Sequence, residues 1–234
     1  MAPPTDMPGV ALIIPVLNEA DTIADVVRAV PRDIVKEVLV VDGGSTDETL
    51  ARARDAGARV ILEPRSGYGA ACRAGVEATV SPVLAFIDGD GSDDPAEISR
   101  LVAPIHAGEQ DFVIGSRARG VREKGSMGMH QLIAGHLAGL LMRALYGVRY
   151  TDMCPLRAIR RDALERLGMR ERTYGWNVEM QMRAARAGLR IIEVPVRHRN
   201  RAGGASKVAG SFRGSLRASW QIASTLVRIA NEMR

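Results

Sequence analysis

Aromatic residues are scarce in this chain, and Phe, Trp and Tyr together make up 4% of its 234 residues. Hydrophobic residues nevertheless reach 46%, so Ala, Val, Leu and Ile must fill the core. Such small and branched side chains are typical of a sheet that helices cover on both faces. The composition therefore favours an α/β protein, and the length suits one compact domain.

Cysteine is also rare, because Cys72 and Cys154 are the only two. Two isolated thiols indicate neither a disulfide framework nor a metal cluster, and they fit a reducing compartment. No stretch reaches the ~18 uncharged apolar residues of a membrane-spanning helix, and the N-terminal MAPPTDMPG lacks the blocks of a signal peptide. We expect a cytoplasmic protein without a membrane span.

The net charge of +5 is unevenly distributed. Acidic residues are concentrated in residues 88–97, whereas Arg and Lys are concentrated in 117–124 and 197–207. No helix-turn-helix, zinc or RNA-binding signature accompanies the cations, which argues against nucleic acid as a partner. Anionic lipids and phosphate-bearing substrates remain as the expected partners.

Short apolar runs and helical periodicity alternate along the chain. Strands are predicted at 10–16, 37–41, 58–62, 83–87, 112–114 and 190–196. Helices are predicted at 19–30, 46–56, 69–79, 95–107, 129–146, 160–167, 176–187 and 211–233. The repeating strand-helix pattern of the first half predicts a largely parallel sheet with right-handed connections.

Polar residues follow three of the predicted strands, where ligands of parallel sheets bind. The segments are PVLNE (15–19), DGGSTD (42–47) and DGDGSDD (88–94). The first two have an ordinary explanation as well, because Asn18 or Asp21 can cap a helix and Ser45 with Glu48 fits a capping box.

The third segment places four acids within seven residues, and these repel one another unless a cation is bound. Hard divalent cations prefer carboxylate oxygens, so Asp88 and Asp90 are candidate metal ligands. A calcium EF-hand is excluded, because Asp93 and Ser99 stand where that loop needs Gly and Glu. The alternative is an acid-rich turn that caps the helix after Pro95.

These blocks resemble the family-2 inverting glycosyltransferases of GT-A fold, especially the dolichyl-phosphate mannose synthase-like branch. The resemblance runs from residue 10 to about 210. Its carriers are PVLNEADTI (15–23), VVDGGSTDET (40–49), RSGYGAACRAG (65–75), FIDGDGSDDP (86–95), IGSRARG (114–120), TYGWNVEMQMRAARAGLRIIEVPV (173–196) and RNRAGGASK (199–207).

The resemblance implies one GT-A domain over residues 1–210, with a nucleotide-binding half at about 8–116 and an acceptor half at about 117–210. The implied fold is a single Rossmann-like, mostly parallel sheet flanked by helices. Residues 211–234 are predicted to add a C-terminal amphipathic helix.

The implied reaction moves a hexose from a GDP- or UDP-sugar, with Mg²⁺ or Mn²⁺ as the cofactor that Asp88 and Asp90 hold. The implied donor-binding residues are Pro15, Asn18, Glu19, Asp42, Gly69, Asp88, Gly89, Asp90, Arg201, Ser206 and Lys207. Carboxylates accept hydrogen bonds from ribose hydroxyls, and Arg201 and Lys207 would donate to the diphosphate. Asp90 also belongs to the implied catalytic set.

Two positions depart from the family pattern. Gly43 stands where many relatives carry a second Asp, so the base of the nucleotide stays open. Ser92 stands where relatives often have Gln, so Ser92, Asp93 or water must complete the metal shell.

Polyprenyl phosphate is the main acceptor that the resemblance implies, with Arg117, His130 and Gln131 as acceptor-binding residues. Relatives of that branch carry basic residues on the helix after the GSR motif, whereas this chain has Met129 and His130 there. Arg119, Arg122 and Lys124 are expected to compensate. An acceptor hydroxyl is therefore the alternative.

A hydroxyl acceptor must lose a proton, so it requires a base. Glu179 lies in the block that carries the catalytic acid in hydroxyl-glycosylating relatives, and Asp152 is a second catalytic candidate. A surface Glu179, or one paired with Arg183 at the next turn, is an equal alternative. Arg157 is expected to pair with Asp152.

Residues 211–234 place apolar side chains on one stripe with arginines nearby. This helix either packs on its own domain or rests in the lipid interface at the inner face of the membrane, and packing is favoured. A homodimer stays open. A non-catalytic basic membrane module is the rival class, and the presence of Asp88, Asp90, Arg201 and Lys207 argues against it.

Overall fold

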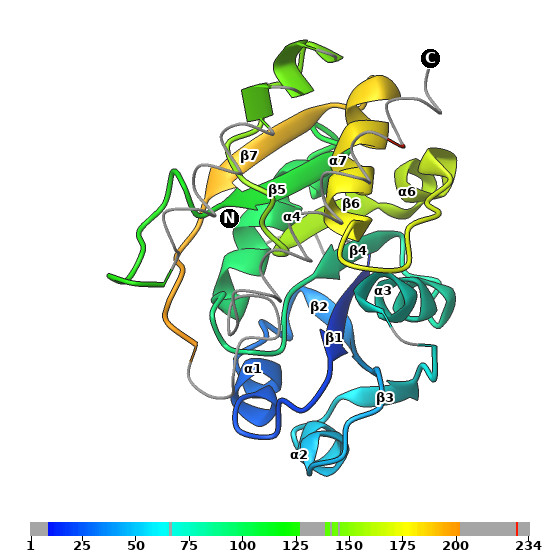
Figure 1. Ribbon diagram of the computed structural model, residues 1–234, viewed down its shortest axis with the longest axis vertical. Helices are drawn as coiled ribbons and strands as arrows, with labels where there is room; N and C mark the ends of the chain where they lie inside the picture. The colour runs from blue at the N-terminus through cyan, green and yellow to red at the C-terminus, as the bar shows by residue number, and fades with distance from the viewer. Residues whose placement is uncertain are drawn as a thin grey trace.

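A computed structural model describes residues 9–65, 67–126, 139–140, 142–144, 146–201 and 228 (Figure 1). Four predicted site residues, His130, Gln131, Ser206 and Lys207, lie outside the described residues. So do most of the helix predicted at 129–146 and all but one residue of the helix predicted at 211–233.

The described residues form one seven-stranded sheet in the order β3-β2-β1-β4-β6-β5-β7 (Figure 1). The strands are β1 (Val10–Val16), β2 (Val35–Asp42), β3 (Arg59–Leu62), β4 (Val83–Phe86), β5 (Phe112–Ser116), β6 (Arg157–Arg160) and β7 (Ile191–Pro195). All pairs are parallel except those of β6, which runs antiparallel to β4 and β5. The predicted, largely parallel α/β sheet is confirmed.

Strand β6 was not predicted from the sequence, where residue 160 was placed at the start of a helix. Its four residues, RAIR, contain two arginines and lack the apolar run of a buried strand. Arg157 is nevertheless fully buried, and its guanidinium donates to the carbonyl oxygens of Cys154 and Asn177. These backbone acceptors allow a charged residue to occupy a central strand.

The helices lie close to their predicted positions. They are α1 (Ile23–Arg28), α2 (Thr49–Asp55), α3 (Tyr68–Glu77), α4 (Ile98–His106), α6 (Arg161–Leu167) and α7 (Trp176–Arg186), with the 3₁₀ turn η1 (Pro95–Glu97) before α4. Helices α1 and α2 begin later than predicted, because the residues after β1 and β2 bond to each other rather than continue a helix.

Strand β1 lies in the core, and all of its residues are buried. Successive side chains of a strand point to opposite faces, so this burial means that both faces of the sheet are covered. Helix α3 packs on β1 and β2, and α4 packs on β5 and β6. The sheet thereby fixes the positions of the loops at its carboxyl edge.

Candidate active site

The loops after β1, β2 and β4 meet at the carboxyl edge, because these three strands are neighbours in the sheet (Figure 1). The loop that precedes antiparallel β6 comes to the same edge. The polar blocks recognised in the sequence are therefore brought together by the topology.

Hydrogen bonds of Asn18 join the loop after β1 to the loop after β2. Its backbone N–H donates to Ser45 Oγ at 2.8 Å, and its side-chain oxygen accepts from the N–H of Thr46 at 2.8 Å. Asn18 has φ 51, a left-handed conformation that Asn tolerates. The side chain bonds across two loops and does not cap α1, whose N-cap is Thr22.

Asp42, at the end of β2, is 3% exposed. Its carboxylate accepts from the backbone N–H groups of Gly44 at 3.0 Å and Ser45 at 3.0 Å, and from the Ser45 hydroxyl. These bonds give the 42–45 turn its shape. A nucleoside contact by Asp42 stays a prediction, as does one by Pro15, which lies in β1 beside Val41.

The acid loop, residues 88–94, has two buried carboxylates. Asp90 is 4% exposed and Asp93 is 1% exposed. Burial, together with the negative charges of Asp90 and Asp93, raises the pKa of Asp88 to about 7. Among the described residues, Asp88 Oδ1 and Asp93 Oδ2 are buried without a hydrogen-bond partner. The repulsion predicted from the sequence is present.

Asp88 and Asp90 fit a divalent cation whose other ligands come from phosphate and water. Within the described part of the chain, no group of three or more His, Cys, Asp or Glu side chains is arranged to hold an ion. Magnesium in nucleotide sites is commonly held by one or two carboxylates, while phosphate oxygens and water supply the other ligands. The unpaired Asp88 oxygen and the neighbouring Asp90 match that donor set.

Two predicted donor-site glycines have packing roles. A Cβ on Gly89 would lie 2.7 Å from Val16 Cγ1, so only glycine lets the acid loop approach β1. A Cβ on Gly69 would lie 2.6 Å from the carbonyl oxygen of Glu171. The N–H of Gly69 donates to the carbonyl of Thr173 at 3.2 Å, which ties α3 to the loop before α7.

Arg201 joins the first loop to the acid loop. Its Nη2 lies 2.6 Å from Asp90 Oδ2, and its Nη1 lies 3.9 Å from Glu19 Oε1. Three predicted donor-site residues from separate blocks are thus brought together.

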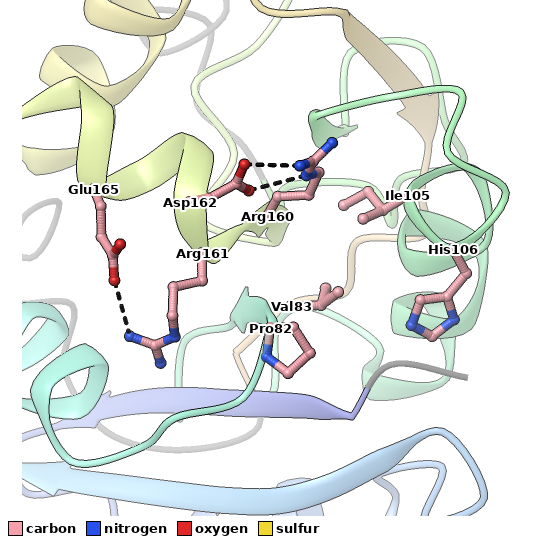
Figure 2. A pocket seen from close by; sticks show the side chains of 8 residues that line it. All are labelled: Pro82, Val83, Ile105, His106, Arg160, Arg161, Asp162 and Glu165. Carbon is pink, nitrogen blue, oxygen red and sulfur yellow. Dashed lines mark hydrogen bonds and ion pairs between the residues drawn. The ribbon is translucent and has the colours of Figure 1, made fainter. Parts of the chain in front are cut away.

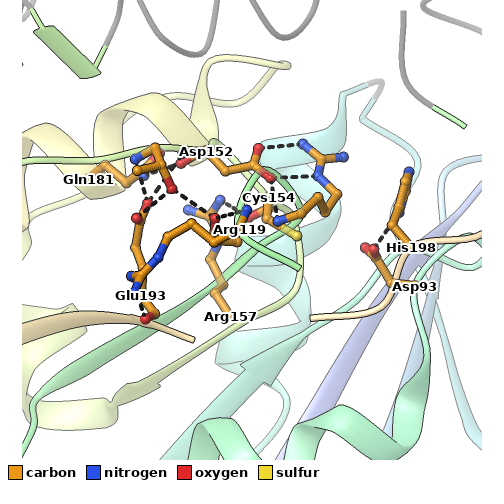
Figure 3. Close-up of polar contacts among 11 residues, drawn as sticks. Asp93, Arg119, Asp152, Cys154, Arg157, Gln181, Glu193 and His198 are labelled. Carbon is orange, nitrogen blue, oxygen red and sulfur yellow. Dashed lines mark hydrogen bonds and ion pairs between the residues drawn. The ribbon is translucent and has the colours of Figure 1, made fainter. Parts of the chain in front are cut away.

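The strap, residues 196–201, is held against the acid loop on one side. His198 Nδ1 lies 2.8 Å from Asp93 Oδ1 (Figure 3). The N–H of Arg199 donates to the carbonyl of Ser92 at 2.8 Å. On the other side, the N–H of His198 donates to the carbonyl of Val121 at 3.0 Å. His198 is 6% exposed. Its contact with Asp93 cannot be predicted from the sequence, because His198 lies in a run of basic residues.

Asp152 is the partner of Arg117. The guanidinium approaches both carboxylate oxygens, at 2.9 Å from Nε and 2.7 Å from Nη2, and the Arg117 N–H adds a third bond at 2.8 Å. Burial alone would raise the pKa of Asp152, but the Arg117 charge and bonds lower it below its ordinary value. The predicted pairing with Arg157 is wrong, since that residue bonds to carbonyl oxygens.

The backbone of Asp152 is fixed as well (Figure 3). Gln181 Nε2 donates to its carbonyl oxygen at 2.9 Å, and its N–H donates to Glu193 Oε1 at 3.2 Å. Helix α7 and strand β7 therefore determine where Asp152 and its arginine lie.

Glu179 is fully buried in α7. Its Oε1 accepts from Arg183 Nε at 2.8 Å, and its Oε2 accepts from the N–H groups of Arg170 at 3.0 Å and Glu171 at 2.6 Å. The pairing with Arg183 is therefore observed, and the alternative of a surface position is wrong. These bonds join the loop before α7 to the helix itself.

A cavity of about 440 Å³ lies at the opposite, amino edge of the sheet (Figure 2). It is lined by Pro82, Val83, Ile105, His106, Arg160, Arg161, Asp162 and Glu165. Its arginines face internal partners, with Arg160 at 2.7 Å from Asp162 and Arg161 at 3.7 Å from Glu165. None of the predicted site residues that the structure describes lines this cavity.

Several known proteins with similar sequences are named as glycosyltransferases. The family model described as glycosyl transferase family 2 matches residues 11–168. An uncharacterized glycosyltransferase of Mycobacterium tuberculosis is 39% identical over 211 residues, covering 88% of this chain and 93% of the relative. The polyprenol monophosphomannose synthase of Mycolicibacterium smegmatis is 32% identical over 218 residues, covering 86% and 81%.

A similar solved structure is glucosyl-3-phosphoglycerate synthase from Mycobacterium tuberculosis, in complex with Mn²⁺, uridine diphosphate and phosphoglyceric acid. It matches with a TM-score of 0.76 and 26% identity, over 95% of this chain and 78% of that chain. Another structure of that enzyme, with Mg²⁺ and uridine diphosphate, has a TM-score of 0.77 at 25% identity, over 96% and 80%.

The fold and the site define a glycosyltransferase of GT-A fold. More particularly, the chain belongs to glycosyl transferase family 2. None of the helices among the described residues is long and apolar enough to cross a membrane.

Proposed function

We propose that this chain is a metal-dependent inverting transferase that moves a hexose from a GDP- or UDP-sugar to the phosphate of a polyprenyl phosphate. One observation carries the choice of acceptor: both predicted bases are engaged in buried ion pairs. Glu179 bonds to Arg183 and two backbone N–H groups, and Asp152 bonds to Arg117. A phosphate acceptor requires no base, because its attacking oxygen is already anionic.

The donor end rests on the convergence of Glu19, Asp90 and Arg201. We assign the divalent cation, Mg²⁺ or Mn²⁺, to Asp88 and Asp90. When bound, such a cation supplies positive charge against the diphosphate of the leaving group. Relatives crystallised with Mn²⁺ or Mg²⁺ and uridine diphosphate support this choice of cofactor.

In the reaction, an oxygen of the acceptor phosphate forms a bond to the anomeric carbon while the bond from that carbon to the diphosphate breaks. The nucleoside diphosphate leaves with the bonding electrons, and no proton needs to move. Arg201 donates hydrogen bonds to the departing charge. Ser206 and Lys207 stay predicted partners of that diphosphate.

The acceptor end rests on fixed and exposed cations. Arg117 is 17% exposed and held in place by Asp152, so its position is set before the acceptor arrives. Arg119, Arg122, Lys124 and Arg197 are exposed on the adjoining loop and strap. The fixed Arg117 and the exposed cations both attract an anionic acceptor. The same cations and the lipid acceptor support peripheral contact with a membrane.

One residue of the C-terminal segment, Arg228, is described. Arg228 is helical, and its Nη2 lies 2.7 Å from Glu171 Oε2. This contact supports packing of the C-terminal helix on the domain. Membrane contact of that helix, a homodimer and acceptor contacts by His130 and Gln131 stay predictions.

The test compares polyprenyl phosphate with polyprenol as acceptors, at equal concentrations in the same detergent, with Mn²⁺ and radiolabelled UDP-glucose or GDP-mannose. We expect label in the organic phase only with polyprenyl phosphate, and loss of that label with chelator. Transfer to polyprenol would contradict the phosphate acceptor. A third arm with 3-phosphoglycerate tests the hydroxyl acceptor that the structural relative's name indicates.

A further inference from the structure

The guanidinium of Arg201 lies at the carboxylate of Asp90, one of the two proposed metal ligands. Its Nη2 contacts Asp90 Oδ2 at 2.6 Å, a distance typical of a strong charge-assisted bond. Its Nη1 is buried without a hydrogen-bond partner among the described residues, and lies 3.9 Å from Glu19. Arg201 thus uses few of its five donors in this state.

The charge around this contact is strongly negative. Asp88 and Asp93 each keep a buried oxygen without a described partner, in a loop where burial disfavours negative charge. A positive group beside Asp90 relieves that repulsion in the absence of a metal. Arg201 provides it, at an oxygen that a divalent cation would also use.

A metal ion that arrives alone must displace the guanidinium from Asp90 Oδ2. The displaced charge would then face Glu19 at a longer distance, which is a poor replacement in a partly buried position. A nucleoside diphosphate changes this balance, because phosphate oxygens offer a guanidinium two parallel bonds. Metal and nucleotide should therefore bind more tightly together than separately.

The replacement of the Arg201 guanidinium by a metal ion at Asp90 needs only a movement of the Arg201 side chain. The backbone just before Arg201 is fixed by the bond from the N–H of Arg199 to the Ser92 carbonyl, and by His198 against Asp93. The Arg201 side chain is 30% exposed, so its guanidinium can turn toward the space outside the acid loop.

We propose that Arg201 substitutes for the divalent cation at Asp90 in the nucleotide-free enzyme, and that this contact makes metal binding depend on the nucleotide. This role rests on the proposed function, which supplies the metal and the diphosphate. Arg201 then determines the order in which metal and nucleotide bind and how strongly each favours the other. It also contacts the leaving group.

The experiment is a Mn²⁺ titration, followed by electron paramagnetic resonance of the free ion, with and without UDP or GDP. It compares the wild type with Arg201→Gln and with the matched control Arg199→Gln, whose arginine pairs with Asp94 and is 53% exposed. In Arg201→Gln we expect Mn²⁺ alone to bind about tenfold more tightly, and the nucleotide to improve Mn²⁺ binding by a smaller factor than in the wild type. Arg199→Gln should match the wild type in both.

Unchanged or weaker binding of Mn²⁺ alone in folded Arg201→Gln, with wild-type coupling, would overturn this role while leaving the proposed function intact. Folding of each variant is checked by circular dichroism. The variant Arg201→Lys keeps a charge, so its affinity for Mn²⁺ alone should lie between those of the wild type and Arg201→Gln. Failure of the wild type to bind Mn²⁺ with either nucleotide would overturn the proposed function itself, and this role with it.

Discussion

At the amino edge of the sheet Asp111 lies between Arg160 and Arg190, whereas at the carboxyl edge Asp88 lies beside Asp90 and Asp93. The Arg190 hydrogen bonds lower the pKa of Asp111 to about 2, despite opposition from burial. Burial and like charges raise the pKa of Asp88 to about 7. The same residue type is satisfied by the protein at one edge and keeps a buried oxygen without a described partner at the other.

The carboxylates of Asp111 and Asp88 differ in their hydrogen-bond partners. Asp111 accepts from the Arg190 backbone at 3.0 Å and from its guanidinium at 2.8 Å, so the protein itself completes the bonding and joins the starts of β5 and β7. Asp88 keeps a buried oxygen without a partner among the described residues. Unsatisfied buried groups are few in folded proteins, and a bound ion is one explanation for such a group.

The largest effect is expected at the carboxyl edge. Asp90→Asn keeps the shape of the side chain and the bond from the Ser92 N–H, but it removes the charge that we propose holds a cation. Transfer should fall by about 10²- to 10³-fold, with the fold intact. Initial rates with Mn²⁺ measure this, and Asp94→Asn is the control. A rate above a tenth of wild type would show that Asp90 is not a metal ligand.

Glu179→Gln separates structural from catalytic use of a buried carboxylate. The variant removes the buried charge that pairs with Arg183, so the free energy of unfolding measured in urea should fall by about 3 kcal/mol. Transfer to polyprenyl phosphate by the folded enzyme should change by less than about threefold, because no base is needed. A loss of about 10²-fold or more on a proven hydroxyl acceptor would restore Glu179 as the base.

Asp111→Asn should lower the free energy of unfolding by about 1–3 kcal/mol at pH 7, since bonds to a charged group are lost. The folded pKa of Asp111 is about 2 and thus below the unfolded value of about 3.9, so its stabilisation is present above pH ~4. It is lost as the pH falls toward 2. Urea unfolding of both proteins at pH 7, 5, 4 and 3 should therefore show a shrinking difference. A constant difference would contradict the lowered pKa.

The smallest effect is expected from the exposed loop beside the site. Arg122→Gln with Lys124→Gln removes two exposed cations that lie far from the donor residues in sequence. We expect KM for polyprenyl phosphate to rise about three- to tenfold at low salt, with kcat unchanged, because exposed charges mainly affect encounter. Equal KM values at 0.02 and 0.3 M salt in the wild type would argue against this electrostatic contribution.

Much of the carboxyl edge could be predicted because the polar blocks after β1, β2 and β4 each follow a run of apolar residues. Strand β6 could not, since its burial depends on carbonyl acceptors from the loop before it and from α7. The pairs Arg117–Asp152 and His198–Asp93 join residues 35 and 105 positions apart, and nothing local in the sequence indicates them. The acid loop was predictable because its repulsion arises within seven residues.

The most direct measurement is the thermal stability of three proteins, wild type, Asp90→Asn and Asp111→Asn, with Mn²⁺, with UDP or GDP, and with both. A ligand at 100 times its Kd stabilises by about 2.7 kcal/mol. We predict a large rise in Tm for the wild type and Asp111→Asn only when metal and the correct nucleotide are both present, and none for Asp90→Asn. An equal rise without metal, or a full rise in Asp90→Asn, would contradict a metal-dependent donor site in the acid loop.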